Sequence, residues 1–204
     1  MYKPVIALFF LSTALMPLNA QNKINYPGTE KGPQVDTYFD QKVADPYRWL
    51  EDDRSEKTGA WVKKENSVTE EYLKKINFRD KIKARLTEIW NYNKQSAPFK
   101  KGNSFFCYKN NGLQNQSVLY IQKSLDDAGE ILLDPNTLSK DGTVSLSGIA
   151  ISKNGKTLAY GISKAGSDWV EIRFKDIATK KDLTDVIKWV KFSGISWQGD
   201  GIYY

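Results

Sequence analysis

The chain has 204 residues, of which 40% are apolar, 26% charged and 13% aromatic. This composition is typical of a globular protein and excludes a disordered one. The chain has no histidine, which excludes a Ser-His-Asp triad or a Cys-His pair built from this chain alone. The single cysteine, Cys107, excludes an internal disulfide framework and a multi-cysteine zinc site. We therefore expect no metal and no other cofactor.

The net charge of +6 raises the question of a polyanionic partner. The lysines are scattered in pairs such as Lys74-Lys75 and Lys180-Lys181, and no run reaches five. Glu70 stands four residues before Lys74, the favourable order for an ion pair on a helix. This pattern indicates a solvated surface and no nucleic-acid partner. A polyanion-binding protein is the alternative, and it rests on net charge only.

Residues 1–20 have the three-part pattern of a secretory signal peptide. Lys3 gives a positive start, residues 5–16 form an uncharged, mainly apolar run, and Pro17 ends it before a possible cleavage site after Ala20. As a helix the run spans roughly 18 Å, too short for a bilayer core of about 30 Å. We expect an exported, soluble protein, in the periplasm or outside the cell, with no membrane partner. The alternative is a buried N-terminal helix.

Residues 21–95 are interpreted as an extended and helical arm. Residues 21–39 are polar and proline-containing, which predicts an extended, wrapping segment, and Pro46 suits the first turn of a helix. Apolar residues from Trp61 to Ile76 recur at helical spacing, and Asn77 is a plausible cap for a second helix that ends near Trp90. We expect the apolar faces of both helices to dock onto other protein rather than to bind a ligand.

After Asn91 the period of the apolar residues falls from 3.6 to 2, and we place the partial β-propeller over residues 96–204. This change predicts short strands over residues 104–108, 118–123, 130–134, 157–162 and 170–174. Asn154-Gly155 and Asp200-Gly201 are predicted to be hairpin turns that supply positive φ.

A repeat is visible in this region. The segment that begins at Gly148 and passes through Asn154-Gly155 resembles the segment that begins at Gly194, and a spacing of about 40 to 50 residues is typical of β-propeller blades. A β-sandwich is the alternative. Residues 96–204 hold about two blades and the start of a third, whereas a closed propeller needs at least about four. The predicted fold class is therefore an α+β fragment, with a helical arm followed by an incomplete β-propeller.

Residues 45–51, Asp-Pro-Tyr-Arg-Trp-Leu-Glu, resemble the N-terminal signature of the prolyl oligopeptidase family. Further segments agree with that family in the same order: residues 89–92, 98–102, 111–120, 133–136, 166–169 and 190–197. The resemblance runs from about Asp36 to Tyr204. Each segment is moderately specific, and the ordered set is strong.

The resemblance implies a helical arm, a seven-bladed propeller and an α/β-hydrolase domain that includes the arm in its shell. It implies a serine endopeptidase that cleaves short proline-containing peptides after proline, with the propeller restricting access. A nucleophile elbow G-x-S-x-G would carry the serine. The nearest string, around Ser163, lacks the final glycine and lies in a strand pattern. We therefore expect no catalytic residue in this chain, no activity of the chain alone, and a missing hydrolase domain as its partner.

One residue is a candidate for substrate binding. Phe174 aligns with a phenylalanine that lines the outer part of the family's substrate pocket. The alternative is packing between blades, on the face that Phe174 shares with Val170 and Ile172. Cys107 is expected to be a small strand residue rather than a reactive thiol. The alternative to the peptidase is a stand-alone secreted module that binds a peptide or protein without catalysis.

Overall fold

The structure is a computed structural model that describes residues 24–204. The predicted signal peptide lies outside the described residues. The chain divides into two compact units, one up to Asp80 and one over Lys81–Tyr204. Within the described part, no helix is both long enough and apolar enough to cross a membrane.

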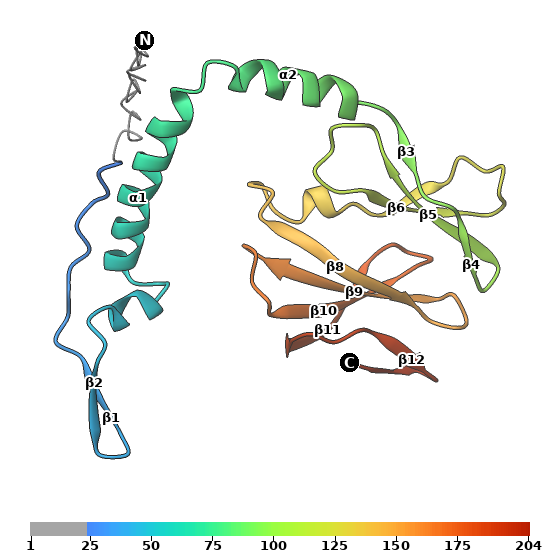
Figure 1. The fold of residues 1–204 in the computed structure, drawn as a ribbon. Coiled ribbons are helices and arrows are strands. Elements are labelled where there is room, and N and C mark those ends of the chain that lie inside the picture. The colour runs from blue at the N-terminus through green and yellow to red at the C-terminus, as the bar shows by residue number, and fades with distance from the viewer. Residues whose placement is uncertain (1–23) are drawn as a thin grey trace, which may run out of the picture. The chain divides into compact units, whose positions relative to one another are not determined.

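The first unit contains a hairpin and a long helix (Figure 1). Strands β1 (Val35–Tyr38) and β2 (Gln41–Ala44) pair antiparallel, and the short 3-10 helix η1 (Arg48–Glu51) follows. The guanidinium of Arg48 forms ion pairs with Asp36 on β1 and with Asp45. Arg48 Nε lies 2.6 Å from Asp45 Oδ2. These pairs fix the hairpin against η1. The extended segment predicted over residues 21–39 thus ends in a hairpin that the sequence analysis did not predict.

Both predicted helices are present. Helix α1 (Glu56–Lys74) begins after Ser55, whose hydroxyl accepts a hydrogen bond from the Thr58 amide at 3.1 Å. Helix α2 (Arg79–Trp90) begins two residues after Asn77, so the prediction that Asn77 caps it is wrong by one position.

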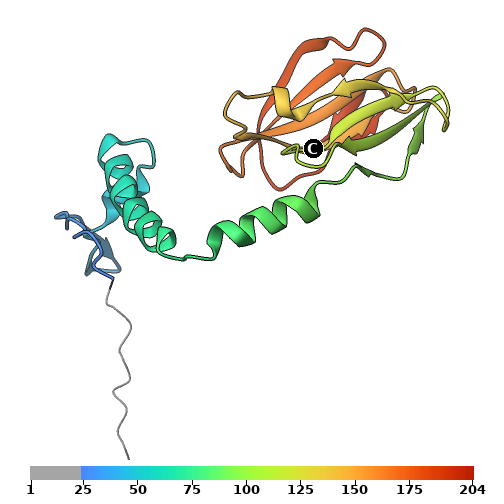
Figure 2. The same ribbon diagram turned by 90° about the horizontal axis from the view of Figure 1, so that it is seen from above.

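The second unit contains two antiparallel sheets and a separate two-stranded hairpin (Figures 1 and 2). The first sheet, here called blade 1, consists of β3 (Lys94–Gln95), β4 (Phe99–Lys101), β5 (Ser104–Asn110), β6 (Val118–Gln122) and β7 (Glu130–Leu133). The short helix η2 (Pro135–Thr137) leads to the second sheet, blade 2: β8 (Val144–Ile151), β9 (Thr157–Lys164), β10 (Val170–Asp176) and β11 (Asp182–Val190). The hairpin β12 (Ser196–Gln198) and β13 (Gly201–Tyr203) follows.

This arrangement confirms the predicted fold class: two helices followed by antiparallel sheets that correspond to partial propeller blades. The boundary between the compact units falls between residues 80 and 81, whereas the predicted division between arm and propeller falls at residues 95 and 96. That division rests on the change in the period of the apolar residues and stays a prediction.

The main core lies between the two blades. Phe106 and Leu119 of blade 1 and Leu158 and Tyr160 of blade 2 belong to one cluster, and each is at most 1% exposed. Leu158 and Tyr160 alternate along β9 as predicted, so strand period 2 brings them to the face that meets blade 1.

Two glycine turns meet where blades 1 and 2 approach each other. A side-chain carbon at Gly102 would lie 3.1 Å from the Asn154 carbonyl oxygen, and Gly102 and Gly155 have φ of +56° and +70°. Both constraints favour glycine. In the β12–β13 hairpin the positive φ falls at Gly199, not at Asp200-Gly201. The predicted position of that turn is therefore wrong by about one residue.

Candidate functional site

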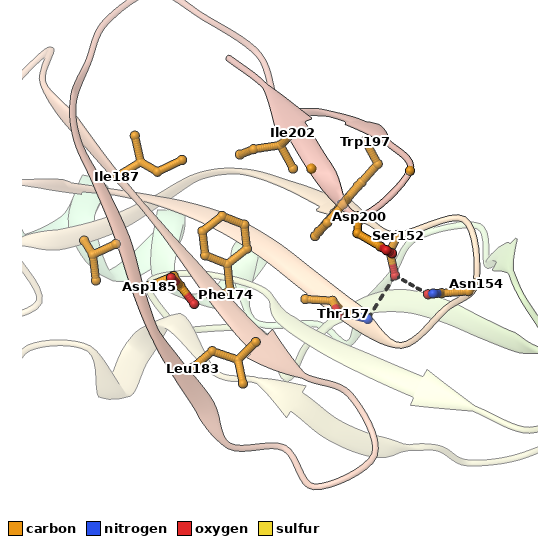
Figure 3. A pocket seen from close by; sticks show the side chains of 13 residues that line it. Ser152, Asn154, Thr157, Phe174, Leu183, Asp185, Ile187, Trp197, Asp200 and Ile202 are labelled. Atoms are coloured by element: carbon orange, nitrogen blue, oxygen red, sulfur yellow. Dashed lines mark hydrogen bonds between the residues drawn. The ribbon is translucent and has the colours of Figure 1, made fainter.

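A cavity of about 550 Å³ lies between blade 2 and the β12–β13 hairpin (Figure 3). Strands β10 and β11, the β8–β9 turn and the β12–β13 turn contribute to its wall. Its principal side chains are Phe174, Leu183, Asp185, Ile187, Trp197 and Ile202. The cavity therefore combines an apolar, partly aromatic wall with acidic groups.

Phe174 lines this cavity and also packs between strands. Because β10 alternates, Ile172 and Phe174 lie on the same face, where Ile172 is fully buried and Phe174 is partly buried. The Phe174 ring meets the Trp197 ring nearly edge-on, with centroids 6.1 Å apart and an interplanar angle of 73°. Phe174 thus lines a cavity, as the substrate-binding interpretation expects, and packs against Trp197, as the packing interpretation expects. Its role in substrate binding stays a prediction.

Trp197 is a cavity residue whose role the sequence analysis missed. Its indole Nε1 donates a hydrogen bond to the Ala150 carbonyl oxygen on β8 at 3.0 Å, which anchors β12 to blade 2. Sequence reasoning placed Trp197 in a repeat and in a family segment, but neither signal indicates that its ring meets Phe174.

The polar end of the cavity belongs to the β8–β9 turn. The Ser152 hydroxyl donates to Asn154 Oδ1 at 2.7 Å and accepts from the Thr157 amide at 2.9 Å (Figure 3). These groups are satisfied within the turn. Asp185 on β11 and Asp200 in the β12–β13 turn add carboxylates to the wall. The chain has no histidine to act as a base, so the cavity has groups suited to binding and lacks a nucleophile–histidine pair.

Two residues considered for reactivity have structural surroundings. Ser163 lies in β9 and donates a hydrogen bond to the Ser167 carbonyl oxygen, which agrees with its rejection as a nucleophile-elbow serine. Cys107 is fully buried in β5 as a free thiol, as expected for a small strand residue.

A partly buried polar cluster stabilises the outer part of blade 2. The Tyr160 hydroxyl donates to Asp182 Oδ1 at 2.9 Å, and Lys175 Nζ lies 2.8 Å from the same oxygen. Burial, followed by the hydrogen bond to the Asp182 carboxylate, raises the pKa of Tyr160 to about 12. This cluster joins β9, β10 and β11.

The geometry defines a protein that contains the opening blades of a β-propeller, and comparison with known proteins identifies the family. Residues 27–204 match the family model described as prolyl oligopeptidase, N-terminal beta-propeller domain. The chain belongs to the prolyl oligopeptidase family, as the resemblance predicted.

Similar sequences come from bacteria and fungi. A prolyl endopeptidase of Elizabethkingia miricola is 49% identical over 200 residues, which cover 98% of this chain and 28% of that protein. Prolyl oligopeptidase A of Galerina marginata is 37% identical over 207 residues, which cover 88% of this chain and 28% of that protein. The chain thus spans less than a third of the length of these relatives.

Solved structures agree in fold. One from an analysis of two prolyl endopeptidases superimposes with a TM-score of 0.73 at 32% identity, covering 86% of this chain and 26% of that one. Prolyl oligopeptidase B of Galerina marginata, bound to a 35mer hydrolysis and macrocyclization substrate, gives a TM-score of 0.69 at 30% identity, covering 87% of this chain and 28% of that one. The matched family model describes the propeller domain, and the match extends over residues 27–204 of this chain.

Proposed function

We propose that this chain is the N-terminal part of a serine endopeptidase that cleaves short peptides after proline. The observation that carries the proposal is the 49% identity to a prolyl endopeptidase over 98% of the chain. Within such a parent, the arm would join the shell of an α/β-hydrolase domain, and blades 1 and 2 would form part of a propeller that restricts access. A stand-alone binding module is the competing function. Reading the gene beyond Tyr204 separates the two, because only the peptidase requires a further frame with a nucleophile elbow.

The 204-residue chain alone is expected to show no hydrolysis of a prolyl reporter peptide. A full-length parent is expected to hydrolyse it, because serine catalysis of this type needs the Ser, His and Asp that a hydrolase domain would supply. The measurement is chromophore release under identical conditions for both proteins. Turnover by the short chain above a blank, or none by the parent, would contradict the proposal.

We further propose that Phe174 contacts the substrate residue upstream of the proline. The support is its place on the cavity wall beside Trp197. In the full-length parent, Phe174→Ala is expected to raise KM for peptides with a bulky upstream residue by roughly tenfold, the equivalent of about 1.4 kcal/mol, with little change in kcat. Phe192→Ala is the matched control, because Phe192 is 85% exposed and does not line the cavity. Equal effects of both substitutions would exclude a specific role for Phe174.

Export is also proposed, on the pattern of residues 1–20. N-terminal sequencing of the protein recovered from its host tests it. Gln21 is the expected first residue, and an intact Met1 would contradict export by cleavage.

A further inference from the structure

The side chain of Gln116 crosses from one blade to the other. Gln116 lies in the loop between β5 and β6 of blade 1. Its Nε2 donates to the Val144 carbonyl oxygen on β8 at 2.8 Å, and its Oε1 accepts from the Leu146 amide at 2.8 Å. A single amide thus binds a donor and an acceptor on the backbone of blade 2.

The backbone groups that Gln116 binds lie on the free edge of blade 2. The strand order of blade 2 is β11-β10-β9-β8, so within residues 24–204 β8 pairs with β9 on one side only. An unpaired strand edge presents N–H and C=O groups to which another extended chain can add. The Gln116 amide occupies two of these groups with the hydrogen bonds that a neighbouring strand would make.

Gln116 is itself held in place by blade 1. Its backbone amide donates to Asn136 Oδ1 at 2.9 Å, and Asn136 Nδ2 donates to the Gln116 carbonyl oxygen at 2.9 Å. The Asn136 side chain is fixed in turn, because its Nδ2 also donates to Asp134 Oδ1 at 2.8 Å. The loop is therefore fixed before it meets β8, which lowers the entropy cost of the contact.

Other contacts join the blades, but they differ in kind. The shared apolar core is non-directional, and the Lys180–Glu130 ion pair is solvent-accessible, a setting in which an ion pair stabilises weakly. The Gln116 bonds are directional and partly buried. They join Gln116 to the backbone of two particular residues, Val144 and Leu146.

We infer that Gln116 is a positioning residue that locks blade 1 to blade 2 in a fixed register and covers the edge of β8 at Val144 and Leu146. The lock closes that part of the edge to an added extended peptide strand. This inference concerns the described chain and does not depend on the proposed peptidase activity.

The test is amide hydrogen exchange, followed by NMR, of the 204-residue chain and its variants. The Leu146 amide is expected to exchange slowly in the original chain and at least about tenfold faster in Gln116→Leu, because its acceptor is removed. Backbone amides within the ladders of both blades, such as those of Tyr120 and Ile172, report whether the variant stays folded.

Gln114→Leu is the matched control. Gln114 lies in the same loop, and its Oε1 accepts from the Asn111 amide at 3.0 Å, a bond that stays within blade 1. In this variant the amide hydrogen of Leu146 is expected to exchange as slowly as in the original chain. Gln116→Glu keeps the acceptor for Leu146 but loses the donor for Val144, so its Leu146 exchange is expected to be intermediate.

Two outcomes would overturn the inference. The first is fast exchange of Leu146 in the original chain. The second is a Leu146 rate in Gln116→Leu that matches the rate in Gln114→Leu. Neither outcome depends on hydrolysis, so failure of the proposed function would be seen separately, in the reporter-peptide assay.

Discussion

Replacing Phe106 with alanine is expected to lower the free energy of unfolding of the Lys81–Tyr204 unit by about 3–5 kcal/mol. Phe106 is fully buried in the core between the blades, and its ring stacks against Phe99 with centroids 5.7 Å apart. The substitution removes the apolar contacts of a whole ring and leaves a cavity that close-packed neighbours fill only in part. Domains of this size are stable by about 5–15 kcal/mol, so the variant is expected to be close to unfolding.

Urea denaturation followed by far-UV circular dichroism measures this effect. Ile131→Ala is the control, because Ile131 is in β7 of the same blade but is 48% exposed. Ile131→Ala is expected to lower the free energy of unfolding by less than about 1.5 kcal/mol, because part of the Ile131 side chain is already in water. Similar losses in the two variants would show that the core between the blades does not dominate stability.

Alkaline pH is expected to destabilise this unit through Tyr160. The Tyr160 pKa is about 12 in the folded protein, whereas its ordinary value is 10.0. The folded protein holds the phenol proton more tightly than the unfolded chain does, so this contribution is complete below pH 10 and is lost as the pH rises through 12. The Asp182 carboxylate is 54% exposed, so solvent screening makes this contribution smaller than the full pKa difference would give.

The comparison of unfolding free energies at several pH values tests the role of Tyr160. Tyr160→Phe is expected to lose the Asp182 hydrogen bond and to show a flatter pH dependence between pH 10 and 12. Burial also raises the pKa of Tyr108, so part of the alkaline loss is expected to remain in the variant. Tyr203→Phe is the control for the removal of a tyrosine hydroxyl, because Tyr203 is 70% exposed. A slope that Tyr160→Phe does not change would contradict the assignment.

Local periodicity was sufficient for much of the fold. Apolar residues at helical spacing predicted α1 and α2, and the alternation of Leu158, Tyr160 and Ile162 predicted the face of β9 that joins the core between the blades. The β1–β2 hairpin escaped prediction because its tip, Phe39-Asp40, has positive φ at two residues and contains no glycine. Turns are predicted from the residue types that favour them, so a turn that lacks those residue types cannot be predicted from the sequence.

The cavity and the contact between the blades depend on long-range neighbours. Phe174 became a candidate through family resemblance, because its alternation with Ile172 is equally typical of a core residue. The contacts of Trp197 with Phe174 and Ala150 join strands from separate repeats. Gln116 reaches Val144 and Leu146 across 28 and 30 positions, and no local pattern distinguishes it from any other loop glutamine. The roles of these three residues depend on contacts with residues far away in the sequence, which local sequence patterns do not predict.

The shared core of blades 1 and 2 has a consequence for biosynthesis. Every residue of that core lies between Phe99 and Ile177, so its contacts are complete once this stretch has left the ribosome. Domains generally fold as units and N-terminal parts fold first during synthesis, at about 5–20 residues per second. The paired blades are therefore expected to fold on the nascent chain within seconds, before most of a longer parent is made, so that later parts can pack against blades that are already folded.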